Sequence, residues 1–300
     1  MPLSTDPRWP RAGDWPEPAG ERTDLALIGI PTWRTSLSST GAAATPEAVR
    51  AALRYYSEFL SPDRGVNDSG ELSFRAADWG DIVDPDAAET AAVAAVAAAA
   101  SLSRVVVALG GDNAATVPAA LGTWGSRIGT AGLVTLDAHH DLRDGVSNGS
   151  PVRRLIEAGL AGARVVQVGI ADFANSAAYS ARAADYGITV IHRDELHRRP
   201  MADVMAEAFE FAGVAGGPIH VDIDVDVCDR SVAPACPASI PGGISASELR
   251  TAARLAGAHP RVESVDFTEV DSTADSPDGR TVRLVALCVL EVAAGLEARP

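Results

Sequence analysis

The chain has 300 residues, 47% of them hydrophobic and 22% charged, with a net charge of −15 at pH 7. A chain of this length and apolar content can bury a large core, and we expect a single α/β domain. The negative charge argues against binding to nucleic acid or to anionic membranes, whose phosphates would repel it, and favours a small soluble substrate.

The three cysteines, Cys228, Cys236 and Cys288, do not have the spacing of a metal-binding or redox motif. No apolar run near residue 1 resembles a signal peptide, and no apolar segment is long enough to span a bilayer. We therefore predict a cytoplasmic protein with reduced thiols.

Residues 1–22 are rich in proline, arginine, glutamate and tryptophan without periodicity, which predicts a mobile N-terminal arm or an oligomer contact. In residues 23–300, short β-branched runs alternate with alanine-rich stretches. The runs predict strands at 24–30, 104–109, 132–137, 164–169, 188–191, 218–224 and 262–268. The stretches predict helices at 46–58, 86–102, 114–123, 151–159, 176–186, 201–212, 246–257 and 281–297. This alternation is typical of a parallel sheet with helices on both faces.

Two helix starts carry capping signals. Thr45 precedes Pro46, which predicts a cap followed by proline at the first helical position. Ser245 and Glu248 have the spacing of a capping box.

Two stretches place metal-binding side chains at every second residue: Asp137-Ala-His-His-Asp141 and Asp222-Ile-Asp-Val-Asp226. In an extended strand alternate side chains share one face, so Asp137, His139 and Asp141 would lie together, as would Asp224 and Asp226. Carboxylates aimed at one spot repel each other unless cations lie between them. The pattern predicts a metal site, with two ions.

A third loop belongs to the same site. Gly110-Gly-Asp-Asn113 directly follows the apolar run Val105–Leu109, just as the two acidic stretches follow predicted strands. Ligands of open parallel sheets bind beyond the carboxyl ends of the strands. The three loops are therefore expected to converge.

The order of these motifs resembles the ureohydrolase family, which comprises arginase, agmatinase and formimidoylglutamase. The resemblance runs from about Gly29 to the C-terminus. It rests on Gly-Gly-Asp-Asn, Asp-Ala-His-His-Asp, Asp-Val-Asp-Val-Cys-Asp with a following Pro-rich Gly-Gly loop, and Asp266-Phe-Thr-Glu-Val. It implies an arginase-like metallohydrolase domain over residues 23–300, with a mostly parallel sheet of about eight strands. The family has a dinuclear manganese centre whose bridging hydroxide attacks a guanidino or formimino carbon.

Carried over residue by residue, the resemblance implies that Asp137 and Asp224 bridge two Mn2+ ions. His139 and Asp226 would complete the shell of one ion, and Asp141 and the residue at 113 the shell of the other. The family usually has histidine after Gly-Gly-Asp, where this chain has Asn113. An amide oxygen is a weaker donor than imidazole for manganese, so this ion is expected to bind loosely, exchange or be missing.

Two acidic residues are the candidate catalytic groups. Glu269 resembles the family's acidic residue that orients the cationic head of the substrate. Asp141 is a candidate to accept the proton of the hydroxide and to relay it to the departing nitrogen.

The substrate is inferred from the loop Asn148-Gly-Ser-Pro-Val-Arg153, which looks like the formimidoylglutamase version and unlike the His-Gly version of arginases. Arg153 is a candidate partner for a substrate carboxylate, and Asn148 and His140 are further candidate contacts. His140 points away from the His139 face, which also suits a packing role. We predict hydrolysis of N-formimidoyl-L-glutamate to L-glutamate and formamide, a late step of histidine breakdown.

Two alternatives stay open. The same machinery could act on a guanidino compound such as guanidinobutyrate or agmatine and release urea. A catalytically weakened relative, kept as a binding or assembly subunit, would also explain Asn113. The resemblance further suggests a homo-oligomer, a trimer or a hexamer.

Overall fold

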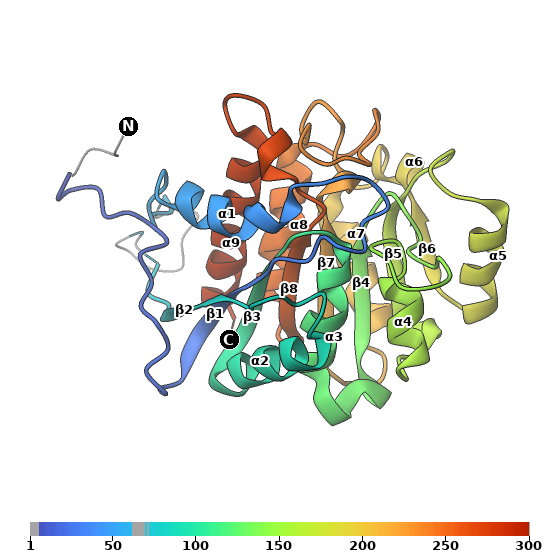
Figure 1. The fold of residues 1–300 in the computed structure, drawn as a ribbon, viewed down its shortest axis with the longest axis horizontal. Coiled ribbons are helices and arrows are strands. Elements are labelled where there is room, and N and C mark those ends of the chain that lie inside the picture. Colours follow the sequence, from blue (N-terminus) through green and yellow to red (C-terminus); the bar gives the residue numbers. More distant parts are fainter. Residues whose placement is uncertain (1–5, 62–69, 71, 300) are drawn as a thin grey trace.

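An eight-stranded parallel sheet runs through the part of the chain that this computed structural model describes, residues 6–61, 70 and 72–299 (Figure 1). The strand order is β2-β1-β3-β8-β7-β4-β5-β6, and every pair of neighbours is parallel. The strands are β1 (Thr23–Ile30), β2 (Ala76–Asp81), β3 (Ser103–Gly110), β4 (Gly132–Leu136), β5 (Val165–Ile170), β6 (Thr189–His192), β7 (Ile219–Asp224) and β8 (Val262–Thr268). The predicted α/β class and parallel sheet are confirmed.

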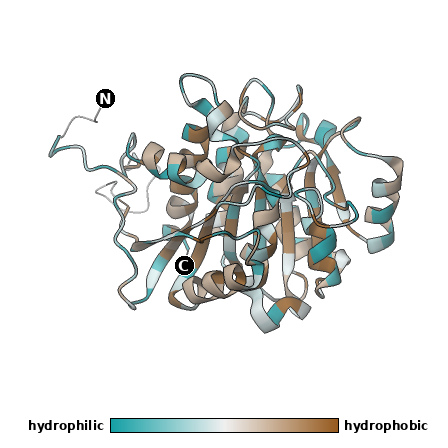
Figure 2. Ribbon diagram, in the orientation of Figure 1, coloured by the Kyte–Doolittle hydropathy of each residue, from teal (hydrophilic) through white to brown (hydrophobic). Residues whose placement is uncertain are grey.

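Helices cover both faces of the sheet (Figure 1). They are α1 (Thr45–Leu53), α2 (Glu89–Leu102), α3 (Thr116–Trp124), α4 (Pro151–Glu157), α5 (Ala177–Tyr186), α6 (Arg193–Leu196), α7 (Met201–Ala212), α8 (Ala246–Ala258) and α9 (Arg280–Glu297). One apolar cluster joins the sheet to α1, α7, α8 and α9, whereas α2, α3 and α4 pack in two clusters on the other face. Figure 2 shows the hydrophobic residues concentrated on the central strands and on the helices beside them.

One strand and one α-helix of the described residues were not predicted. β2 is an edge strand with the sequence Ala-Ala-Asp-Trp-Gly-Asp, and only its first two residues are buried. Because only two of its residues face the core, β2 does not have the apolar run by which the central strands were predicted. The other element, α6, has four residues, too few to show helical periodicity.

The two capping predictions have different outcomes. Ser245 and Glu248 form the predicted capping box: the Ser245 hydroxyl accepts from Glu248 N–H, and the Glu248 carboxylate accepts from Ser245 N–H. The prediction for Thr45 is wrong, because Ala44 is the N-cap and Thr45 lies in the helix. The Thr45 hydroxyl instead donates to Val270 O, so it links the helix to a distant segment rather than capping it.

The described part of the N-terminal arm, residues 6–22, contains no helix or strand. Ala12 is nevertheless fully buried. Trp15 packs edge-on against Phe74, and its Nε1 donates a hydrogen bond of 2.7 Å to Glu58 Oε1. Mobility of this segment stays a prediction.

The three cysteines are free and buried. Among the described helices, none is both long and apolar enough to cross a membrane.

Candidate metal centre

The predicted ligands meet above the centre of the sheet. Asp137 follows β4, Asp224 ends β7, Asn113 follows β3, and Glu269 follows β8. These four strands are neighbours in the order β3-β8-β7-β4, and because they are parallel their carboxyl ends lie at one edge. The predicted convergence is confirmed.

The route by which the side chains converge differs from the predicted strand alternation. β4 ends before Asp137, and Asp141 has a left-handed φ of 53°. Asp226 lies in a 3-10 turn, Val225–Val227, and its N–H donates to the capping carboxylate of Asp224 at 2.9 Å. Turns beyond the strands, rather than the two-residue period of the strands, therefore bring the ligands together.

Two groups of side chains each suit a cation. Asp137, His139 and Asp226 form one group, and Asp137, Asp141 and Asp224 form the other, with the ligand atoms of each group within 4.8 Å of one another. Asp137 belongs to both groups and is fully buried, and its Oδ2 has no hydrogen-bond partner. A buried carboxylate oxygen without a partner is costly, so this arrangement fits a shared ligand of two cations.

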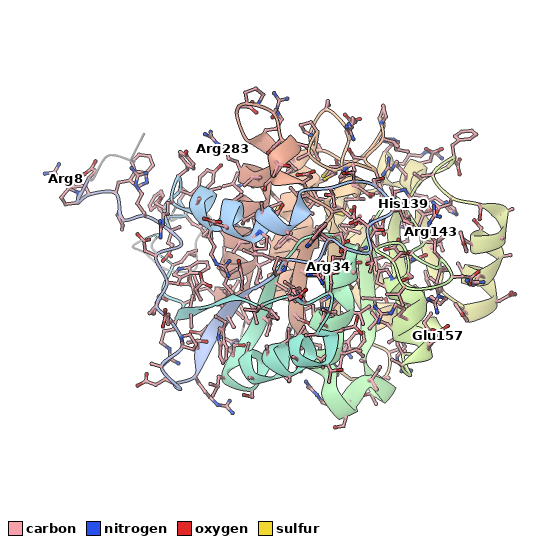
Figure 3. The ribbon with its side chains drawn as sticks, viewed as in Figure 1. Arg8, Arg34, His139, Arg143, Glu157 and Arg283 are labelled. Atoms are coloured by element: carbon pink, nitrogen blue, oxygen red, sulfur yellow. The ribbon has the colours of Figure 1, made fainter. Side chains whose placement is uncertain are left out.

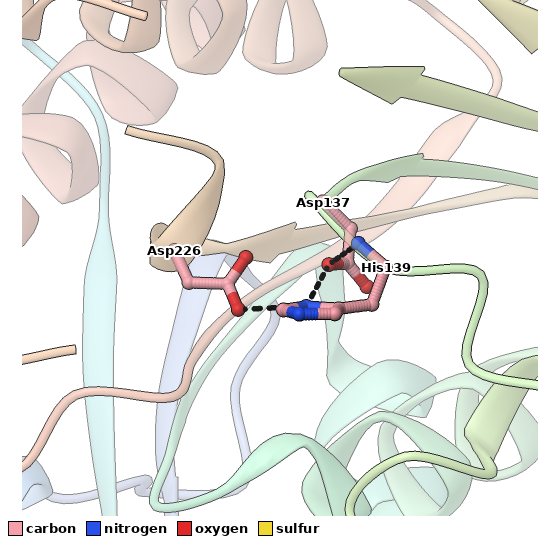
Figure 4. Close-up of side chains that lie close together, drawn as sticks. All are labelled: Asp137, His139 and Asp226. Atoms are coloured by element: carbon pink, nitrogen blue, oxygen red, sulfur yellow. Dashed lines mark hydrogen bonds and ion pairs between the residues drawn. The ribbon is translucent and has the colours of Figure 1, made fainter. Parts of the chain in front are cut away.

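His139 lies between two carboxylates (Figure 4). Its Nδ1 is 3.0 Å from Asp226 Oδ2 and 3.4 Å from Asp137 Oδ1. Burial lowers the pKa of His139, but hydrogen bonds and negative charge from Asp137 and Asp226 outweigh it and raise the pKa to about 12. Without metal, a proton on Nδ1 takes the place of a cation, and metal binding would release it.

Burial and mutual repulsion raise the pKa of three carboxyls of the site. Burial, followed by the charge of Asp226, raises the pKa of Asp137 to about 6. Burial and the neighbouring carboxylates likewise raise the pKa of Asp141 and of Asp224 well above its ordinary range. The cluster binds protons because it carries more negative charge than a buried site tolerates.

These pKa shifts predict a pH-dependent stability in the metal-free protein. Burial raises the pKa of Glu269 from 4.5 to about 7, and the pKa of Asp137 rises from 3.8 to about 6. A raised carboxyl pKa means that the folded state holds the proton more tightly, so stability is lost as pH rises through the folded pKa. We expect the melting temperature in EDTA to fall between about pH 4 and 7, and Mn2+ to restore it most at the upper end. A metal-independent melting temperature at pH 7.5 would contradict this expectation.

Asn113 is at the site, but its amide oxygen is occupied. Oδ1 accepts hydrogen bonds from Thr116 Oγ1 at 2.6 Å and from Thr268 Oγ1 at 3.1 Å. Nδ2 donates to Asp141 Oδ2 at 2.5 Å. An amide nitrogen that bears two protons cannot ligate a cation, so Asn113 in this orientation supports Asp141. Its predicted role as a ligand would require the amide to rotate.

Glu269 and Asp141 share an unusual backbone conformation. Among the described residues, four that are not glycine have positive φ, and three of them line one cavity: Asp141 at 53°, Glu269 at 62° and Phe173 at 65°. Such residues cost roughly 1–3 kcal/mol each and cluster at functional sites. Glu269 Oε1 accepts from Asn113 N at 2.9 Å and from Asn148 Nδ2 at 2.6 Å, which fixes the carboxylate beside the metal ligands.

The cavity has a volume of about 400 Å3. Four acidic residues, Asp141, Asp224, Asp226 and Glu269, line it together with His139. Asn148 and His140 also line it, and their contact with substrate stays a prediction. The His140 ring is held by the protein, with Nδ1 2.7 Å from Gln167 Oε1 and Nε2 3.3 Å from Ser180 Oγ.

The structure does not bring Arg153 to the cavity. Its guanidinium donates to Arg143 O at 2.6 Å and to Gly145 O, and it pairs with Glu157 at 2.5 Å. These bonds brace the loop between Asp141 and α4. The predicted carboxylate contact of Arg153 is therefore not supported by its position.

Arg143 lines the cavity together with His139, a role that we did not predict. Both residues are labelled in Figure 3. Within the described part of the chain its guanidinium has no hydrogen-bond or ion-pair partner. The side chain crosses Gly149, where an added Cβ would lie 2.7 Å from Arg143 Cδ. In the sequence, only the position of Arg143 two residues after Asp141 could have indicated this role.

Comparisons with known proteins agree with this site. The arginase family profile matches residues 23–295. The chain is 33% identical over 287 residues to Bacillus subtilis (strain 168) formimidoylglutamase, covering 92% of this chain and 88% of the relative. The crystal structure of formimidoylglutamase from that strain has a TM-score of 0.90 at 29% identity, covering 100% of this chain and 95% of that chain.

A second solved structure shows the same fold. Trypanosoma cruzi formiminoglutamase with Mn2+ matches with a TM-score of 0.83 at 23% identity, covering 93% of this chain and 95% of that chain. The family match spans most of the chain and includes every element of the site. The chain belongs to the arginase family, hydrolases that act on amidino and guanidino compounds.

Proposed function

We propose that this protein is a manganese-dependent formimidoylglutamase that hydrolyses N-formimidoyl-L-glutamate to L-glutamate and formamide. The observation that carries the proposal is the polarity of the cavity. Carboxylates that can hold metal ions and a cationic amidine line it, and so does Arg143, whose guanidinium has no hydrogen-bond or ion-pair partner among the described residues. A substrate with an amidinium at one end and carboxylates at the other matches both.

The donor set favours manganese. Two ions would be held by Asp137, Asp224, His139, Asp226 and Asp141, with Asn113 as a weaker candidate. Hard carboxylate oxygens with a single imidazole nitrogen suit Mn2+. When bound, such ions would activate water for attack near neutral pH.

The two catalytic candidates would have different roles. Glu269, held by Asn113 N–H and Asn148, would pair with the amidinium and orient it. Asp141 would accept a proton from the attacking water and deliver it to the departing nitrogen of glutamate. Water adds to the formimino carbon, the bond from that carbon to the glutamate nitrogen breaks, and formamide leaves with the carbon.

Arg143 would bind a substrate carboxylate, the role first expected of Arg153. A free guanidinium at a cavity wall can form a bidentate pair with a carboxylate. The same charge would repel the free ammonium of agmatine. The proposed substrate class is therefore an amidine that carries a carboxylate, which includes guanidinobutyrate as the second candidate.

A product assay separates these candidates. The Mn2+-loaded protein is incubated with N-formimidoyl-L-glutamate, guanidinobutyrate and agmatine, and formamide and urea are measured. We expect formamide from the first substrate at a kcat/KM at least tenfold above urea release from either other compound. Urea release from a guanidino compound, without formamide, would overturn the proposal.

Histidine at position 113 should strengthen the second metal site. Asn113→His places an imidazole beside Asp141, where the present amide directs its nitrogen. We expect Mn2+ titration to show at least tenfold tighter binding of the weaker ion, because imidazole is the better donor. Unchanged affinity for both ions would mean that residue 113 does not face a metal.

The cytoplasmic location, the place in histidine breakdown and the homo-oligomer, a trimer or hexamer, remain predictions. Light scattering of the purified protein would determine the oligomer.

A further inference from the structure

Arg193 is a buried arginine behind the metal ligands. It is the first residue of α6 and 6% exposed. Its Nη2 donates to Val227 O at 3.2 Å, and its Nε donates to Gly169 O at 3.3 Å. Its Nη1 is buried without a hydrogen-bond partner, and among the described residues no carboxylate forms an ion pair with it.

The two carbonyls belong to segments on either side of a ligand. Gly169 lies in β5, and Val227 ends the 3-10 turn that carries Asp226. Strand β4, which leads into Asp137, runs between β5 and β7 (Figure 1). The guanidinium donates to a carbonyl of one neighbour, β5, and to a carbonyl of the turn that follows the other, β7. Arg193 thus connects the segments that flank Asp137.

The same segments are packed tightly against each other. A Cβ on Gly169 would lie 2.5 Å from Val227 Cγ2 and 3.3 Å from Asp137 O. Asp137 N donates to Val168 O at 3.0 Å, and Ala138 N donates to Asp226 Oδ1 at 3.2 Å. A shift of the turn away from β5 would therefore separate Asp226 from Asp137 and His139.

The charge of Arg193 has a second consequence. Burial of an unpaired guanidinium is unfavourable, and the charges of Asp226 and Asp137 favour its charged form most. A fixed cation behind these carboxylates reduces their mutual repulsion without occupying the space between them. A buried apolar residue could fill the volume but could not supply this charge.

We propose that Arg193 is a positioning residue of the metal centre: it holds the Asp226 turn against β5 and offsets the charge of the Asp137–His139–Asp226 group. This inference rests on the metal centre of the proposed function but not on the identity of the substrate. If the protein binds metal and acts on another compound, the inference still stands.

The test compares metal affinity and stability in three variants. Arg193→Met removes the charge and both hydrogen bonds, and Arg193→Lys keeps the charge without the forked donor. Arg164→Met is the matched control, because Arg164 also donates to two carbonyls, Ala131 O at 2.7 Å and Gly129 O at 2.8 Å, at the opposite end of β4. Each variant is titrated with Mn2+ by calorimetry, and its melting temperature is measured in EDTA.

Replacing a residue that supports a metal ligand typically lowers metal affinity by roughly 10–100-fold. We expect a loss in this range for the tighter ion in Arg193→Met, a smaller loss in Arg193→Lys, and wild-type affinity in Arg164→Met even if its melting temperature falls. Wild-type affinity in Arg193→Met, or an equal loss in Arg164→Met, would overturn the proposal. If Arg193→Met does not fold, Arg193→Lys decides, and wild-type affinity there would overturn it as well.

Discussion

Replacing Asp141 with asparagine should reduce kcat by roughly 10²–10⁴-fold, the usual contribution of a positioned acid or base, without unfolding the protein. Asp141 is buried and lines the cavity, and it takes part in the second ligand group. An asparagine has nearly the same shape but cannot accept and return a proton. It also removes one of several mutually repelling carboxyls, so the metal-free variant should be at least as stable as the wild type.

The measurement is kcat with N-formimidoyl-L-glutamate, taken together with the bound Mn2+ per chain and the melting temperature in EDTA. Asp144→Asn is the control, because Asp144 lies three positions along the same loop but is exposed and paired with Arg182. It should retain activity within about twofold, as surface ion pairs contribute little. Wild-type turnover in Asp141→Asn would refute the proton-transfer role.

Replacing Arg143 with methionine should reduce kcat/KM for N-formimidoyl-L-glutamate by about 10–100-fold. A hydrogen bond to a charged group contributes about 1.5–3 kcal/mol, and each 1.4 kcal/mol corresponds to a factor of ten. Arg143 lines the cavity, and its guanidinium forms no ion pair with any residue that the structure describes, so its replacement breaks no such pair. The loss should appear mainly in KM, since the group lies away from the reacting carbon.

A substrate without carboxylates distinguishes binding from general damage. An N-alkyl formamidine should be hydrolysed equally by the wild type and by Arg143→Met. Arg34→Met serves as the control variant, because Arg34 pairs with the exposed Asp84 and does not line the cavity. If both substrates lose the same factor, or if Arg34→Met matches Arg143→Met, the carboxylate contact is wrong.

Much of the fold was predictable because the central strands are buried on both faces. β3 and β4 read as nearly continuous apolar runs, which is typical of parallel strands. β7 and β8 are also largely buried, although polar residues interrupt their apolar runs. Strand β2 lacked such a run because its second half, ending at Asp81, is exposed at the sheet edge. The metal ligands were predictable for a related reason, since strand ends of a parallel sheet meet at one edge.

The directions of individual side chains were not predictable in the same way. The left-handed φ of Asp141 and Glu269 arises from turns that the sequence does not mark with glycine. The Asn113 amide takes its orientation from Thr116 and Thr268, which lie on different elements. Arg153 and Arg143 are alike in the sequence. Only the packing of their shared loop, with Gly149 beneath Arg143, decides which one reaches the cavity.

The central claim is that carboxylates from separate strand ends hold two cations, with Asp137 common to both. Diffraction from Mn2+-soaked crystals, recorded above and below the manganese absorption edge, tests it most directly. We predict two anomalous peaks, one bounded by Asp137, His139 and Asp226 and the other by Asp137, Asp141 and Asp224. The absence of any anomalous peak within bonding distance of Asp137 would contradict it.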